Sequence, residues 1–169
     1  MKKIIAILLA VVMVLGLCAC GGNGEGGKAE KTFDKLHVGV GREDITPPNP
    51  VGAHLNGGGD PNRLAETILD DLTITCIAIT DKANNTVLIY VQDIHNPVAQ
   101  AFTNDSRKAI SEATGVPFEN IYMTATHTHS SLHPRDTTNE KNLEFNAIYD
   151  KAVVEAAKTA MEDRAPATM

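Results

Sequence analysis

Three stretches in the first half of the chain have the hydrophobic patterns of β-strands. Leu36, Val38 and Val40 alternate with polar or small residues, and the same period of two recurs over residues 72–79. Successive side chains of a strand point to opposite faces, so both stretches are predicted strands with one apolar face. Residues 87–91 are apolar without interruption, which indicates a third strand and predicts that both of its faces are buried.

Helical and strand-like patterns alternate in the second half. Asn96-Pro97 offers a helix N-cap followed by proline at the first helical position, and the helical spacing after it stops at Gly115. Residues 121–126 predict a strand, residues 145–160 keep the 3, 4, 3, 4 apolar spacing of a second helix, and residues 164–169 indicate the start of another strand. This order predicts an α/β fold: a layered mixed sheet with a parallel βαβ unit flanked by helices.

The first twenty residues have the pattern of a bacterial export signal. Lys2 and Lys3 precede an apolar run over residues 4–17, which is shorter than the roughly 20 residues of a membrane-spanning helix. The run ends in Leu17-Cys18-Ala19-Cys20, which fits a lipoprotein cleavage site. We expect residues 1–19 to be removed, Cys20 to carry the lipid, and residues 20–35 to form a flexible tether. The remaining domain, residues 36–169, would be extracytoplasmic and anchored to the bacterial cell membrane.

Charge and cysteine content narrow the range of partners. The formal net charge is -6, and it becomes -8 when Lys2 and Lys3 are removed. This acidic balance argues against nucleic acid as a partner.

Of the three cysteines, Cys20 and Cys76 would remain after cleavage, and lipid on Cys20 would leave no pair for an internal disulfide. Cys76 lies on an apolar strand, where a small core residue is expected. Nothing in the sequence indicates an oligomeric state.

Two histidines directly follow the predicted strand over residues 121–126. If the strand continued, His127 and His129 would share one face and could bind at one site. A right-handed crossover would make this strand parallel to the one before it, so both would end at the edge where open α/β sheets bind ligands. Asp93 and His95 would lie at the same edge. For both residues two interpretations stay open: a structural role near the start of the helix, or a part in the site.

Several segments, in this order, resemble the N-terminal part of the catalytic domain of neutral/alkaline non-lysosomal ceramidases. They are Gly-Arg-Glu-Asp-Ile-Thr-Pro-Pro at positions 41–48, the turn-rich loop after it, Thr-His-Thr-His-Ser at positions 126–130, and the helical segment 145–148. The resemblance covers the chain from about Leu36 to its end. It implies a zinc-dependent amide hydrolase that releases a fatty acid from an N-acylated sphingoid base, a small lipid substrate.

The resemblance also implies roles for individual residues. His127 corresponds to a zinc ligand, and His129 to a catalytic residue that orients substrate or transfers a proton. Asp93, His95 and Ser130 are candidates for lining the site. The family's other metal ligands, a later His, a Glu and a Tyr, and an important Ser have no counterpart here. We therefore expect the chain to be an incomplete N-terminal portion of a larger catalytic domain, inactive alone, with the remaining zinc ligands beyond residue 169.

Three alternatives remain open. Ser-Leu-His-Pro at positions 131–134 and residues 67–71 depart from the family pattern, so the substrate could be another amide or an ester. His133 could join His127 and His129, with Asp93 or His95, in a site complete within this chain. A lipid-anchored surface domain could also bind a ligand without turnover. Gly57-Gly58-Gly59 would let backbone approach a ligand closely. Arg42 and Asp44 are expected to brace their loop.

Overall fold

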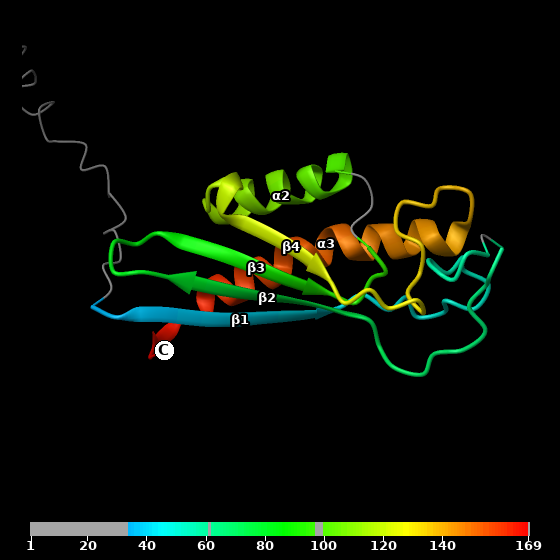
Figure 1. Cartoon of the computed structure of the whole chain (residues 1–169), viewed down its shortest axis with the longest axis horizontal. Coiled ribbons are helices and arrows are strands. Elements are labelled where there is room, and N and C mark those ends of the chain that lie inside the picture. Colours follow the sequence, from blue (N-terminus) through cyan, green and yellow to red (C-terminus); the bar gives the residue numbers. More distant parts are fainter. Residues whose placement is uncertain (1–33, 61, 97–99, 169) are drawn as a thin grey trace, which may run out of the picture. The chain divides into compact units, whose positions relative to one another are not determined.

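The computed structural model describes residues 34–60, 62–96 and 100–168, which form a five-stranded sheet and two α-helices (Figure 1). The strands lie in the order β4-β3-β2-β1-β5. Their bounds are Leu36–Asp44 for β1, Thr73–Thr80 for β2, Thr86–Gln92 for β3, Ile121–Ala125 for β4 and Ala165–Ala167 for β5. The helices are α2, Gln100–Thr114, and α3, Glu140–Glu162, and a short 3-10 turn, η1, spans Phe118–Asn120.

The sheet is mixed, and its one parallel pair is the predicted one. β1, β2 and β3 pair antiparallel in sequence, β5 pairs antiparallel with β1, and β3 pairs parallel with β4 through the crossover that contains α2. This confirms the α/β class and the βαβ unit. β1, β3 and β4 therefore run in one direction, and the loops that follow them emerge at the same edge of the sheet (Figure 1).

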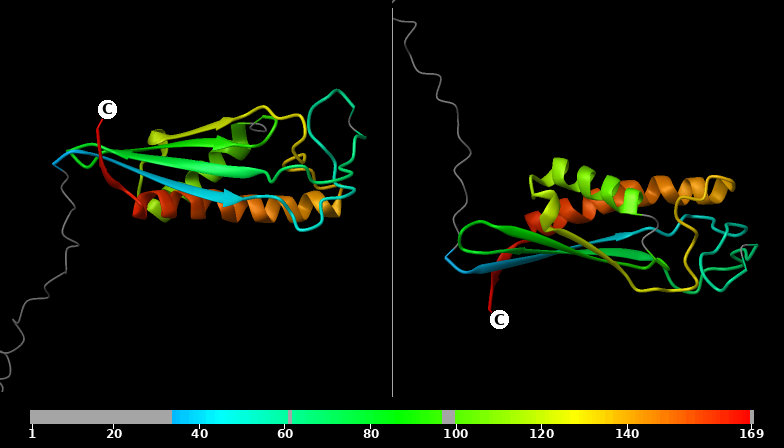
Figure 2. Two further views of the ribbon diagram at one scale, coloured as in Figure 1. Left: turned by 90° about the horizontal axis from the view of Figure 1, so that it is seen from below. Right: turned by 45° about the horizontal axis from the view of Figure 1, so that its top comes forward.

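Both helices cover one face of the sheet (Figure 2). The Tyr90 hydroxyl of β3 donates a hydrogen bond to the Val153 carbonyl of α3 over 2.7 Å, and the rings of Phe102 on α2 and Tyr149 on α3 lie 5.2 Å apart. α3 lies so close to β1 that a Cβ at Gly41 would be 2.1 Å from the Ala156 carbonyl oxygen. Glycine on the strand and alanine on the helix therefore permit this close packing.

The opposite face of the sheet carries an apolar row that is partly exposed among the described residues. Val40, Ile77, Ile89 and Tyr122 lie in register across four strands, with Val40 47% and Tyr122 57% exposed. The uninterrupted apolar run at residues 87–91 predicted burial on both faces, which is wrong for this structure. Leu88 and Tyr90 are fully buried under the helices, whereas Val91 on the other face is 41% exposed.

The helix ends follow local capping rules. α2 stops before Gly115, which has φ +74 and donates its N–H to the Ser111 carbonyl, the left-handed C-terminal cap expected of glycine. α3 begins five residues earlier than its apolar spacing predicted, because the Asn139 side chain caps it by accepting a hydrogen bond from the Lys141 N–H. No helix among the described residues is long and apolar enough to cross a membrane.

Some predictions concern residues that the structure does not describe. The signal segment 1–19, the lipidation site Cys20 and most of the tether 20–35 lie outside the described residues, as does the helix start at Pro97. The first described strand begins at Leu36.

Candidate functional site

Three imidazoles meet at the carboxyl edge of the sheet. His95 lies in the loop after β3, and His127 and His129 lie in the loop after β4. The ring centroids of His95 and His127 are 4.2 Å apart and nearly stacked, those of His95 and His129 are 4.5 Å apart, and those of His127 and His129 are 5.1 Å apart. One ring nitrogen from each residue lies within 4.8 Å of the other two. Because β3 and β4 are parallel, the loops that follow them bring their histidines to the same place.

The two histidines of the Thr-His-Thr-His-Ser segment converge by a turn and not by strand alternation. β4 ends at Ala125, and His127 has φ +62 in the left-handed region, where a residue with a β-carbon is uncommon. The rings of His127 and His129 consequently meet edge to face, at 79°. The expectation that both side chains share one face of an extended strand is wrong, although the two rings do lie together.

The loop between β1 and β2 supplies a backbone wall for the imidazoles. Gly57 has φ +88, and a Cβ there would lie 2.8 Å from Cδ2 of His95 and 3.0 Å from Cγ and Nδ1 of His129. The residue before it, Asn56, donates its backbone N–H to the Ser131 carbonyl over 2.9 Å. The backbone at Gly57 therefore approaches two of the histidines closely, whereas the expected approach to a ligand stays a prediction.

Ser131 and Arg63 fix the backbone of the histidine loops. The buried Ser131 hydroxyl accepts a hydrogen bond from the His95 N–H over 3.0 Å and donates one to the Thr128 carbonyl over 3.4 Å. The Arg63 guanidinium donates to the His129 carbonyl. Sequence reasoning missed both residues in these roles, because nothing in the local pattern relates Arg63 or Ser131 to residues in other loops.

The other predicted site residues lie around this cluster and not within it. Asp93 accepts hydrogen bonds from the Thr73 N–H, at 3.0 Å, and hydroxyl, at 2.8 Å, so it braces the start of β2. Ser130 is exposed beside the cluster. The Nδ1 atom of His133 lies 3.0 Å from the Pro134 carbonyl oxygen, and His133 is not part of the three-imidazole group.

A pocket of about 630 Å³ lies next to the cluster, within the size range of small-molecule sites. Asp93 and three residues after β4, Thr128, Ser130 and Leu132, line part of it, and the β1–β2 loop lines the rest. Its wall combines apolar side chains with four carboxylates and one guanidinium, contributed by Leu55, Leu64, Ile68, Leu69, Leu72, Leu132, Glu66, Asp70, Asp71, Asp93 and Arg63, among others.

The electrostatic surroundings favour a neutral His95. Burial lowers the pKa of His95, and the neighbouring imidazoles of His127 and His129 lower it further because a second positive charge would repel theirs. A neutral imidazole has a free lone pair, which is the form that binds a metal ion. The buried Nδ1 atom of His95 has no hydrogen-bond partner among the described residues. The three nitrogens thus have the chemistry and the spacing of a metal-binding group.

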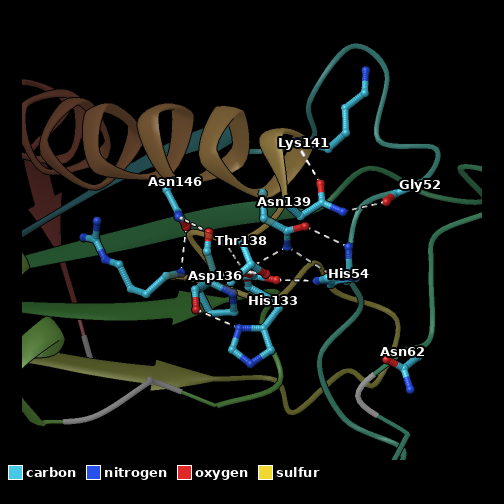
Figure 3. Close-up of polar contacts among 12 residues, drawn as sticks. Gly52, His54, Asn62, His133, Asp136, Thr138, Asn139, Lys141 and Asn146 are labelled. Atoms are coloured by element: carbon cyan, nitrogen blue, oxygen red, sulfur yellow. Dashed lines mark hydrogen bonds and ion pairs between the residues drawn. The ribbon is translucent and has the colours of Figure 1, made fainter.

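A second polar network attaches the site loops to the N-terminal end of α3 (Figure 3). Asn142, which is fully buried, accepts from the His54 N–H over 2.7 Å and donates to the carbonyls of His54 and His133 over 3.0 Å each. Asp136 accepts from Nδ1 of His54 and from Thr138. Burial alone would raise the pKa of Asp136, but these hydrogen bonds outweigh it and lower the pKa to about 2.

Two other predictions hold in the structure. The Asp44 carboxylate accepts a hydrogen bond from the Thr46 N–H over 2.7 Å, so it braces its loop as expected. Cys76 is fully buried on β2, and burial raises the pKa of its thiol to about 12. This residue is a core side chain without nucleophilic character at neutral pH.

The fold is similar to part of two solved ceramidase structures. One is described as a ceramidase complexed with C2 and the other as neutral ceramidase from Pseudomonas aeruginosa; the TM-score is 0.64 for both, at 18% and 17% identity. Each match covers 78% of this chain and 22% of the ceramidase chain. No protein-family model and no curated protein matches the sequence. The described domain therefore has the fold of about a fifth of a neutral ceramidase, in agreement with the resemblance in the sequence.

Proposed function

We propose that this protein is a ceramidase-like, zinc-dependent hydrolase of N-acyl amides, with His127 as a zinc ligand and His129 as a catalytic residue beside it. The observation that supports this most strongly is the meeting of three imidazoles at the carboxyl edge of a ceramidase-like sheet. Hydrolysis would consume water and release a fatty acid and an amine, with a sphingoid base as the amine if the substrate is ceramide.

The residues present fit a zinc ion. Imidazole nitrogen is a common zinc ligand, and catalytic zinc sites keep a position open for substrate or water. The unpartnered Nδ1 of His95 shows that hydrogen bonds do not satisfy the cluster fully. Zinc, when bound, supplies Lewis-acid polarisation of a carbonyl and acidifies water.

His129 is placed for proton transfer. Its side chain is exposed, so its imidazole can exchange protons with solvent. Its backbone is held by the hydrogen bond from Arg63 to its carbonyl, and its ring is held against Gly57. A positioned imidazole with these properties can protonate the nitrogen of the departing amine as the amide bond breaks.

The pocket beside the cluster is the proposed place for the substrate. Leu55, Leu64 and Leu132 offer apolar surface to an acyl or alkyl chain, and Thr128 and Ser130 form the wall nearest to the histidines. An amide group at that wall would lie beside the imidazole cluster. The same arrangement would also accept another N-acyl amide or an ester, so the choice of substrate has to be measured.

The activity assay uses the full-length protein with zinc and compares N-acylsphingosine with simpler N-acyl amides. We expect fatty acid release from ceramide, and a loss of about 100-fold or more in H127A. H133A is the matched control, because its ring lies in the same region but outside the cluster. Hydrolysis of simple amides without ceramide would refute the sphingolipid assignment. Zinc binding without hydrolysis of any amide would favour a binding domain.

We also propose that the protein is a lipoprotein anchored to the outside of the cell membrane through Cys20. The support is the charged start, the apolar run and the Leu-Cys-Ala-Cys sequence at positions 17–20. Intact-mass measurement of membrane-extracted protein should give a chain that begins at Cys20 and carries diacylglycerol. A C20S variant with unchanged mass and membrane partitioning would contradict the anchor.

A further inference from the structure

We infer that His95 is a metal ligand that acts on the same ion as His127. This assignment rests on the proposed function, since it concerns the same centre, but neither the family resemblance nor the sequence motif supplies it. His95 lies more than thirty residues before the Thr-His-Thr-His-Ser segment, and only the parallel pairing of β3 with β4 brings the two loops together.

Proximity is the first argument. Among the three rings, His95 and His127 are the closest pair, with centroids 4.2 Å apart and planes inclined by 29°. Their ring nitrogens belong to a group whose members all lie within 4.8 Å of one another. In a zinc site each imidazole nitrogen lies about 2.0–2.1 Å from the ion, so small side-chain adjustments bring two nitrogens at this spacing onto one ion.

The unpartnered nitrogen is the second argument. Nδ1 of His95 is buried and makes no hydrogen bond to any described residue. Leaving a buried polar atom unsatisfied costs free energy, about 1–3 kcal/mol in general. Other polar groups of the same loop are well satisfied: the His95 N–H donates to the Ser131 hydroxyl, and the Asp93 carboxylate accepts two hydrogen bonds from Thr73. The His95 ring interacts with the Asn96 side chain, and its Nδ1 is the ring atom that has no partner among the described residues.

The fixed position of the ring is the third argument. Gly57 packs its backbone against Cδ2 of His95, and Ser131 ties the backbone of His95 to the loop that carries His127 and His129. A ligand that is held before the ion arrives loses less conformational entropy on binding. Of the three rings, that of His95 is partly buried, whereas His127 and His129 are both exposed, so His95 is the imidazole that the fold encloses most.

The test measures metal binding directly, with the full-length protein of the activity assay and no substrate. The chain is stripped of metal, and zinc affinity is measured by competition with a chromophoric chelator. H95A and H95F are compared with wild type, H127A, H129A and H133A. H95F keeps an aromatic ring against Gly57 and His127 without a ligand nitrogen, so it separates the loss of a ligand from a loss of packing. Cobalt absorption spectra report the change in ligand number independently.

If His95 is a ligand, H95A and H95F bind zinc at least about tenfold more weakly than wild type, as does H127A, and the cobalt spectrum changes in each. H133A and H129A keep wild-type zinc affinity, and H129A lacks turnover in the separate activity assay with substrate. The inference is overturned if H95A and H95F bind zinc as tightly as H133A while H127A does not, and the proposed function then still stands. If wild type binds no zinc, both fail. Thermal unfolding of each metal-free variant shows that the comparison is between folded proteins.

Discussion

Replacing Gly57 by alanine tests whether the backbone of the β1–β2 loop holds the imidazoles in place. Gly57 has φ +88, and a Cβ there would lie 2.8 Å from Cδ2 of His95 and 3.0 Å from two atoms of the His129 ring. Gly52 has the same φ of +88, but a Cβ there would have nothing within 4 Å. The two alanine variants therefore share the backbone cost and differ in the contact with the imidazoles.

The geometry sets the expected magnitudes. An L-residue in the left-handed region costs about 1–2 kcal/mol, so both variants should lose that much stability. In G57A the shortest contact, 2.8 Å, is also 0.6 Å less than the 3.4 Å at which ordinary contact begins. If the rings did not move, this overpacking would add about 1–3 kcal/mol. Because the shortest contact is with the His95 ring, we expect much of the effect to appear as a displaced His95 imidazole and about tenfold weaker zinc binding.

Two assays separate these effects. Urea unfolding of the metal-free proteins gives the stability change, and chelator competition gives the zinc affinity. G52A should lose stability with wild-type zinc affinity, whereas G57A should lose at least as much stability and bind zinc more weakly. Equal zinc affinities in the two variants would refute the idea that the Gly57 backbone positions the imidazoles.

Three further predictions concern the fold around the site. In G41A the new Cβ would lie 2.1 Å from the Ala156 carbonyl oxygen. Because backbone cannot move aside as a side chain does, we expect the free energy of unfolding, measured in urea, to fall by about 3 kcal/mol or more. A urea midpoint equal to that of G52A would contradict the packing of α3 on β1. The pKa of Asp136 is lowered to about 2, below the usual value of about 3.9 in an unfolded chain, so its carboxylate stabilises the fold above pH 4. The stability advantage of wild type over D136N should therefore shrink as pH falls from about 4 to about 2, and urea midpoints that keep the same difference at pH 7 and pH 2.5 would rule this out. The pKa of the buried Cys76 thiol is raised to about 12, so iodoacetamide at pH 8 should modify Cys76 only when urea unfolds the protein. Mass spectrometry of the peptide that contains Cys76 measures the modification. Rapid modification of the native protein would show that the thiol is accessible.

The elements that could be predicted from the sequence are those whose signal is local. Alternation over residues 72–79 and the helical spacing before Gly115 depend only on neighbouring residues, and both elements are present. The crossover rule then sufficed to predict that β3 and β4 are parallel. The start of α3 was predicted too late because residues 140–144 are mostly polar, and the cap at Asn139 that extends the helix was not considered.

The site was less predictable because its geometry depends on contacts between loops. The sequence indicated that His127 and His129 lie together, but the left-handed turn at His127 that sets their angle has no signature in the residue types. His95 was one of several candidates at the sheet edge. Its selection over Asp93 and His133 depends on hydrogen bonds that occupy those two residues elsewhere, and such long-range contacts cannot be read from spacing alone.

The left-handed backbone at His127 also has a consequence for protein engineering. A residue with a β-carbon in this region carries strain of about 1–3 kcal/mol, whereas glycine and asparagine adopt it more readily. Substituting either one at position 127 would relieve that strain and at the same time remove the imidazole proposed to bind zinc. A variant library selected for thermal stability alone would therefore favour replacement of this histidine, so selection at this position has to include metal binding as a criterion.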